Sequence, residues 1–135
     1  MAMNYLAVFV AAVVVFIIGY LWYSPFLFGN LWMKLSNISI KDVNKSKKKG
    51  MGKYLVSAFI ALLVMAGVME LLLELTGYTD FFSGIVLGFL LWLGFQATVM
   101  LNSVLWEGKR VSLYLLNILH QLAALVVMGG ILGAW

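Results

Sequence analysis

Four long apolar runs divide this chain, and each is long enough to cross a lipid bilayer. They cover about residues 4–23, 54–76, 81–105 and 112–135. At ~1.5 Å of rise per residue, about 20 helical residues span the ~30 Å hydrocarbon core of a membrane. The runs do not alternate apolar and polar residues, as the strands of a membrane β-barrel would. We therefore predict an all-α membrane protein with four transmembrane helices in one integral membrane domain, residues 1–135.

The composition argues against a soluble domain and against several kinds of site. Of the 135 residues, 64% are hydrophobic and only 10% are charged, which is too few to build a polar surface. The chain has no cysteine, so disulfides, thiolate metal ligands and cysteine nucleophiles are excluded. No basic patch interleaved with aromatic residues lies outside the apolar runs, and we expect no nucleic-acid partner. The expected surroundings are membrane lipids.

A short aromatic segment and a basic segment separate the first two runs. Ser24 is a good N-cap and Pro25 suits the first position of a helix, so we predict a helix over about 25–35. It is too short to span, and its aromatic residues and closing lysine suggest that it lies in the membrane interface. The hydrophilic residues 36–53 are predicted to form a basic loop near lipid headgroups.

The positions of the basic residues predict an orientation. All nine lysines and arginines fall in two alternate loops. One group lies between the first and second runs, and Lys109 and Arg110 lie between the third and fourth. Because cytoplasmic loops of membrane proteins carry the excess of Lys and Arg, we predict that both basic loops are cytoplasmic and both termini are outside the cell.

The segment after the first run carries a specific motif. It reads Trp22-Tyr23-Ser24-Pro25-Phe26-Leu27-Phe28-Gly29, followed by Trp32-Met33-Lys34. This W-Y-S-P element resembles the signature of a bacterial membrane family known as domain of unknown function 1761. Later residues resemble that family as well, namely Gly94, Phe95, Asn102, Glu107, Gly108, Lys109, Leu116, Asn117, His120 and the closing 128–132. The resemblance implies a small four-helix protein of the inner membrane, and it implies no activity.

Polar side chains within the spans are candidate functional groups, because burying them in lipid is costly. By helical rise, His120 lies ~12 Å, Gln96 ~9 Å and Asn117 ~7 Å above the cytoplasmic edge, so the three share a layer. Gln121 shares a helix face with His120, and Asn102 lies near the edge. These groups either hydrogen-bond across helices and hold the bundle together, or line a polar cavity or proton path. We expect the imidazole to bond an amide or hydroxyl on a neighbouring span.

Two carboxylates, Glu70 and Glu74, lie one turn apart near the outer end of the second span. No basic residue lies on that side of the membrane to pair with them. Glu70 is the deeper of the two, so it is either protonated or facing a wet crevice. It has a structural role or forms a cation or proton site. Because a single four-helix unit would leave Glu70 few places away from lipid, we also predict a homo-oligomer.

Three classes of function remain to be compared. A non-enzymatic membrane scaffold or interaction protein is contradicted by nothing in the sequence. The alternative is an oligomeric transporter or channel for a small solute or protons that uses Gln96, Asn117 and His120. Small multidrug transporters are of similar size, but they rely on a carboxylate in the first span, which this chain lacks. We find no catalytic constellation, metal motif or nucleotide loop, so we predict no enzyme activity, no cofactor and no metal site. The substrate is not indicated.

Overall fold

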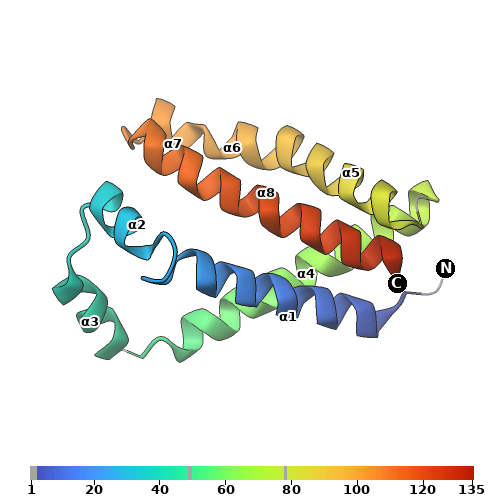
Figure 1. Cartoon of the computed structure of the whole chain (residues 1–135), viewed down its shortest axis with the longest axis horizontal. Coiled ribbons are helices and arrows are strands. Elements are labelled where there is room, and N and C mark those ends of the chain that lie inside the picture. The colour runs from blue at the N-terminus through green and yellow to red at the C-terminus, as the bar shows by residue number, and fades with distance from the viewer. Residues whose placement is uncertain (1–2, 49, 78) are drawn as a thin grey trace.

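The computed structural model describes residues 3–48, 50–77 and 79–135, and it contains no strand within them (Figure 1). Four helices are long and apolar enough to cross a membrane: α1 (Tyr5–Trp22), α4 (Gly52–Thr76), the helix Phe81–Leu105 and α8 (Val111–Ala134). The third of these is divided into α5 (Phe81–Leu91), the π-helix η1 (Trp92–Ala97), α6 (Thr98–Met100) and α7 (Asn102–Leu105). The predicted all-α class with four membrane-length helices is confirmed.

The helix that follows α1 begins later than predicted. Helix α2 covers Gly29–Ser36, so Pro25 does not start it. Residues 23–28 instead form a tight turn, in which the backbone N–H groups of Leu27 and Gly29 both donate to the Ser24 carbonyl. The hydroxyl of Ser24 donates back to the Leu21 carbonyl, 2.7 Å away, and therefore does not cap a new helix.

The basic segment 36–53 contains a helix that was predicted as loop. Helix α3 covers Ile40–Lys48. Ser39 and Asp42 form a capping box: the Ser39 N–H donates to the Asp42 carboxylate at 2.9 Å, and the Asp42 N–H donates to the Ser39 hydroxyl at 3.2 Å. The N–H and the hydroxyl of Ser39 both donate to the Asp42 carboxylate at 2.9 Å, and these two bonds lower the pKa of Asp42. The Ser39-x-x-Asp42 spacing is a sequence signature of this helix start. The high charge of the segment instead led to its prediction as a loop.

Glycines bring α5 and α8 into backbone contact. A Cβ added at Gly84 would overlap the Gly129 carbonyl, and one added at Gly129 would overlap the Gly84 carbonyl. One turn further along, a Cβ at Gly88 would meet the Leu125 carbonyl, and at the opposite end a Cβ at Gly133 would meet the Asp80 carbonyl. The glycines spaced four residues apart on each helix, Gly84 and Gly88 on α5 and Gly129 and Gly133 on α8, therefore face one another in this interface.

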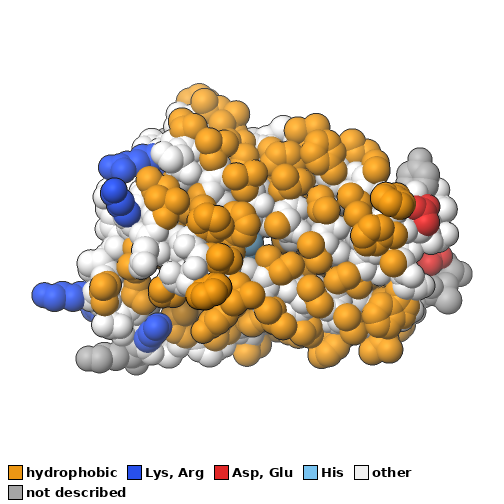
Figure 2. All heavy atoms as spheres, in the orientation of Figure 1, with side chains coloured by type: hydrophobic (Ala, Val, Ile, Leu, Met, Phe, Trp, Pro, Cys, Tyr) orange, Lys and Arg blue, Asp and Glu red, His pale blue; other side chains and the backbone are white. Residues whose placement is uncertain are grey.

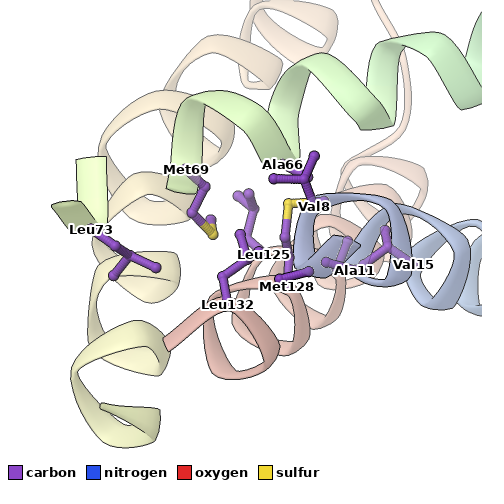
Figure 3. Close-up of a cluster of buried hydrophobic side chains, with 11 residues drawn as sticks. Val8, Ala11, Val15, Ala66, Met69, Leu73, Leu125, Met128 and Leu132 are labelled. Atoms are coloured by element: carbon purple, nitrogen blue, oxygen red, sulfur yellow. The ribbon is translucent and has the colours of Figure 1, made fainter. Parts of the chain in front are cut away.

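The hydrophobic core lies on the other side of α8, where α8 packs against α1 and α4 (Figure 3). Three alanines, Ala11, Ala66 and Ala124, let the helices approach, and Met69 and Met128 fill the space between them. We call this group the core cluster; it comprises Ala7, Val8, Ala11, Val15, Ala66, Met69, Leu73, Ala124, Leu125, Met128 and Leu132.

Charge separates the two ends of the bundle (Figure 2). The end that carries α2, α3 and the loop 106–110 holds the basic residues, and we call it the basic end. The other end holds the chain termini, the turn before α5 and the carboxylates Glu70, Glu74 and Asp80, and we call it the acidic end. The axis of the bundle thus runs between two ends of opposite charge.

Candidate functional site

The turn between α1 and α2 places a cluster of aromatic rings at the basic end. Trp22 lies 4.7 Å from Phe28 between ring centroids, and Tyr23 lies 6.1 Å from Trp32. We call Trp22, Tyr23, Phe28 and Trp32 the aromatic cluster. The turn that positions these rings requires a glycine at position 29, because a Cβ there would overlap the backbone of Tyr23 and Ser24. The W-Y-S-P motif and Gly29 therefore act together to fix where the aromatic rings lie.

His120 lies directly against this cluster. Its ring centroid is 5.1 Å from that of Tyr23 and 5.8 Å from that of Trp22. On α1, Gly19 leaves the space that the imidazole occupies, since a Cβ at Gly19 would lie 3.2 Å from Nε2 of His120. The side chain is thus held between α1 and the aromatic cluster.

Three buried ring nitrogens of this site have no hydrogen-bond partner among the described residues. They are Nδ1 and Nε2 of His120 and Nε1 of Trp22. The expectation that His120 bonds an amide or hydroxyl on a neighbouring span is therefore wrong. The Tyr23 hydroxyl and the Asn117 amide bond each other instead, because Tyr23 donates to Oδ1 of Asn117 at 2.8 Å.

A groove with a volume of about 420 Å³ lies beside the imidazole, between α1, α4 and α8. We call it the His120 groove. His120, Gln121, Tyr20 and Tyr23 supply its polar atoms, and the rest of its wall is apolar. The apolar wall residues are Val15, Phe16, Gly19, Leu55, Ala58, Ala61, Leu62, Met65 and Ala124.

The structure brings together only part of the polar layer predicted from the sequence. Asn117 and His120 both contact Tyr23, and Gln121 lines the groove with His120. Gln96 lies elsewhere, in a separate apolar groove of about 350 Å³ between α4 and η1. Asn102 is exposed. Depth along the helix was a sound basis for placing these residues in a layer, but it does not tell which way each side chain faces.

The remaining candidate residues lie at the two ends of the bundle. Glu107 and Gly108 are exposed in the loop at the basic end, where Gly108 adopts a φ of 69° that favours glycine. At the acidic end Glu70 is only 5% exposed, and Glu74 is half-buried. Because Glu70 is buried within one chain, it gives no reason to expect an oligomer, contrary to the argument from the sequence.

Sequence reasoning missed two bonds that tie the π-helix η1 to α8. The indole N–H of Trp92 donates to the Ile118 carbonyl at 2.6 Å. In the other direction, the hydroxyl of Tyr114 donates to the Ala97 carbonyl. A π-helical turn often marks a functional or strained region. Here it carries the Trp92 donor of one bond and the Ala97 acceptor of the other, and no residue pattern in an apolar run announces such a turn.

Within the part of the chain that the structure describes, no three His, Asp or Glu side chains lie together in a way that could hold a metal ion. The model of one protein family matches residues 6–133; it is described as Protein of unknown function (DUF1761). No curated protein and no solved structure matches the chain.

Proposed function

The chain belongs to the DUF1761 family of unknown function, and we propose that it is a non-enzymatic membrane protein that binds a small amphiphilic molecule at His120. One observation carries the proposal: His120 lines a groove of about 420 Å³, and both of its ring nitrogens are buried without a partner among the described residues. The indole of Trp22, whose nitrogen is also unpartnered, lies against the imidazole, with 5.8 Å between the ring centroids. The ligand would place a polar group against these nitrogens and an apolar part along the groove.

The chemistry of the nitrogens defines the polar group. The indole N–H of Trp22 is a donor only, and a neutral imidazole has one donor and one acceptor. Leaving such a buried group without a partner costs about 1–3 kcal/mol. The two donors suit a carbonyl or carboxylate group, whose oxygens accept from both rings, and a protonated carboxyl group also donates to the remaining imidazole nitrogen. The apolar wall of the groove suits an alkyl or isoprenoid chain, which would enter from the bilayer.

This proposal accounts for His120 better than a purely structural role does. A side chain that only joins helices would be bonded across them, as Asn117 is to Tyr23, and His120 has no such bond among the described residues. A proton or solute path through one chain is less well supported, because the core cluster lies between the His120 groove and the acidic end. The transporter alternative therefore needs a second conformation or a second copy.

The chain contains one histidine, which makes nitrogen NMR a direct test. The protein is labelled with ¹⁵N-histidine and ¹⁵N-tryptophan in lipid nanodiscs and titrated with decanoate, 2-undecanone or dodecane. We expect decanoate and 2-undecanone to shift the imidazole signals and the Trp22 indole signal, which Trp22→Phe assigns. Dodecane has no acceptor and should leave them unchanged. Equal shifts with dodecane, or no shift with any of the three, would contradict the proposal.

Two glycine variants provide the matched control. Gly19→Ala adds a methyl group 3.2 Å from Nε2 of His120 and should weaken 2-undecanone binding several-fold. Gly67→Ala adds the same methyl group where no atom lies within 4 Å, and it should bind as wild type does. Equal weakening in both variants would point to a general effect of helix substitution.

A second candidate, the scaffold or interaction role, is favoured by Gln96. Its amide lines an apolar groove between α4 and η1, where the amide of a second copy could meet it in lipid. We propose a homo-oligomer joined there. Native mass spectrometry from mild detergent should show an oligomer that Gln96→Leu reduces to monomer. Only monomer for the wild type, across several lipid compositions, would count against it.

We propose that the protein lies in the inner membrane with its basic end in the cytoplasm, because all nine Lys and Arg residues of the sequence fall in the two segments that join the spans at that end. Single cysteines at Ala2, Ser46 and Lys109 can be introduced without native background, since the chain has none. An impermeant thiol reagent on intact cells should label only Ala2→Cys. Labelling of Ser46→Cys would reverse the orientation.

A further inference from the structure

A second pocket lies at the acidic end of the bundle, and it shares no lining residue with the His120 groove. It has a volume of about 540 Å³ and forms where α1 begins and where α4 and α8 end. Glu70 and Glu74, one turn apart on α4, both line it. Asn4, Thr79 and the aromatic residues Tyr5 and Trp135 complete its polar and aromatic wall.

Glu70 is the notable member of this wall. Its side chain is only 5% exposed, and its Oε2 atom is buried without a hydrogen-bond partner among the described residues. No basic residue of the sequence lies at this end of the bundle. A carboxylate in such a place needs a cation or several donors, because an uncompensated buried charge is strongly unfavourable. The pocket lining contains no basic residue, and no donor among the described residues bonds Oε2 of Glu70.

We propose that this pocket binds an organic ammonium group, with the ammonium against Glu70 and its carbon substituents beside Tyr5 and Trp135. Charge-assisted N–H···O bonds to a carboxylate are among the strong hydrogen bonds of proteins. Aromatic faces attract cations through their negative electron clouds. Glu74 adds a second negative charge on the same wall, and Leu73 and Leu132 provide apolar contacts.

A bare metal ion fits this pocket less well. Calcium takes about 6–8 oxygen ligands and magnesium requires a near-octahedral set. The pocket offers two carboxylates, and no third His, Asp or Glu joins them among the residues that the structure describes. Its volume of about 540 Å³ is also many times that of an ion. An ammonium with several carbon atoms fills such a space and needs fewer ligands.

The same chemistry occurs in a free amine and in the headgroup of phosphatidylethanolamine. The pocket is at one end of the membrane-length helices, where headgroups lie, so both sources can reach it. The experiments below distinguish the free amine from phosphatidylethanolamine, because only the second is a lipid that can be retained with the protein.

The experiment measures n-butylammonium binding to the full chain by calorimetry, in detergent with phosphatidylglycerol as the only added lipid. We expect saturable binding that equal concentrations of sodium do not displace. Glu70→Gln should weaken it at least tenfold, and Glu74→Gln by a smaller factor. Glu107→Gln, which removes an exposed carboxylate at the basic end, should bind as wild type does. Unchanged affinity in Glu70→Gln, or equal displacement by sodium, would overturn the proposal.

A second measurement avoids the need for a folded variant. Dicyclohexylcarbodiimide should modify Glu70 of the wild-type protein, and n-butylammonium should protect it from modification, as mapped by mass spectrometry. Modification at the same rate with and without the amine would contradict the site. In native mass spectrometry, retention of one phosphatidylethanolamine that n-butylammonium displaces identifies the lipid as the source. Binding of n-butylammonium without lipid retention identifies a free amine.

Discussion

The two faces of α8 are packed in opposite ways. Toward α5, glycines bring the two backbones together, and no space remains for a side chain at Gly84, Gly88 or Gly129. Toward α1 and α4, alanines and methionines form a core cluster, and a pocket of about 540 Å³ and a groove of about 420 Å³ lie at its two ends. The unpartnered side chains of Trp22, Glu70 and His120 all lie on this second side.

The difference separates structural residues from candidate functional ones. Within a bilayer, apolar side chains gain no hydrophobic free energy when two helices associate. Close backbone contact between glycines instead stabilises the pair through dispersion attraction. A helix pair joined in this way has no room for a ligand. On the α1–α4–α8 side, close packing ends at a pocket and at a groove. Buried polar groups there have no partner among the described residues, and bound ligands would supply those partners. We therefore expect substitution of the glycines between α5 and α8 to affect folding. Substitutions on the α1–α4–α8 side, which we call the open side, should affect binding.

The largest effect should come from Gly129→Ala. The added Cβ overlaps the Gly84 carbonyl, so α5 and α8 must separate, which we expect to cost about 3 kcal/mol of unfolding free energy. Gly67→Ala, with open space around the new methyl group, should be neutral or slightly stabilising. Equilibrium unfolding by sodium dodecyl sulfate in mixed micelles measures both. Equal stability of the two variants would mean that the glycine contact is not what joins these helices.

A smaller effect is expected at η1, where side-chain bonds replace glycine contact. Trp92→Phe removes the bond to the Ile118 carbonyl, and Tyr114→Phe removes the bond to the Ala97 carbonyl. Each should lower the unfolding free energy by about 1 kcal/mol, and their effects should be roughly additive because they share no atoms. The same denaturant titration provides the measurement. No loss in either variant would show that the π-helical turn is held by packing alone.

The sequence predicted the spans well because their cause is local. Twenty or so apolar residues in a row have one stable arrangement in a bilayer, and no end of an observed helix differs from the predicted run by more than two residues. The start of α2 was wrong because the turn at Ser24 depends on backbone bonds and on contact with Gly29. A good N-cap followed by proline is equally compatible with that turn.

The candidate site was only partly predictable for a related reason. Asn117, His120 and Glu70 could be named from their cost in lipid, but their partners depend on how each helix is rotated. That rotation is set by contacts such as Gly19 against His120 and Gly84 against Gly129, which join distant parts of the chain. Trp22 was identified only as part of a motif, and nothing in the sequence indicated that its nitrogen lies unpartnered next to the imidazole.

On the open side, Tyr23→Phe should have a modest effect on stability and a distinct effect on the site. It removes the hydroxyl that bonds Asn117, and cross-helix bonds in membrane proteins contribute about 0.6 kcal/mol on average. The freed Asn117 amide can then turn toward other partners, so the ring-nitrogen signals of the single histidine should shift in the NMR spectrum. Asn117→Leu provides the second arm of a double-mutant cycle. Full additivity of the two substitutions would mean that the bond contributes nothing.

The smallest effect concerns the start of α5 and depends on pH. Asp80 caps α5: the Ser83 N–H donates to its carboxylate at 2.9 Å and the Ser83 hydroxyl at 2.7 Å, and these bonds lower the pKa of Asp80. Because the folded pKa lies below the unfolded one, the stabilisation is fully present above about pH 4. It is lost as the pH falls through the folded pKa. Unfolding free energies of wild type and Asp80→Asn should therefore converge on acidification, since asparagine caps without titrating.

Asp42→Asn offers the comparison at the basic end: it alters the same kind of cap on α3, outside the four membrane-length helices. Its pH profile should follow wild type, because α3 lies outside the four membrane-length helices and we expect it not to take part in the unfolding of the bundle. If Asp42→Asn and Asp80→Asn changed the profile equally, the acid sensitivity would belong to surface charge in general and not to the start of the α5–α8 pair.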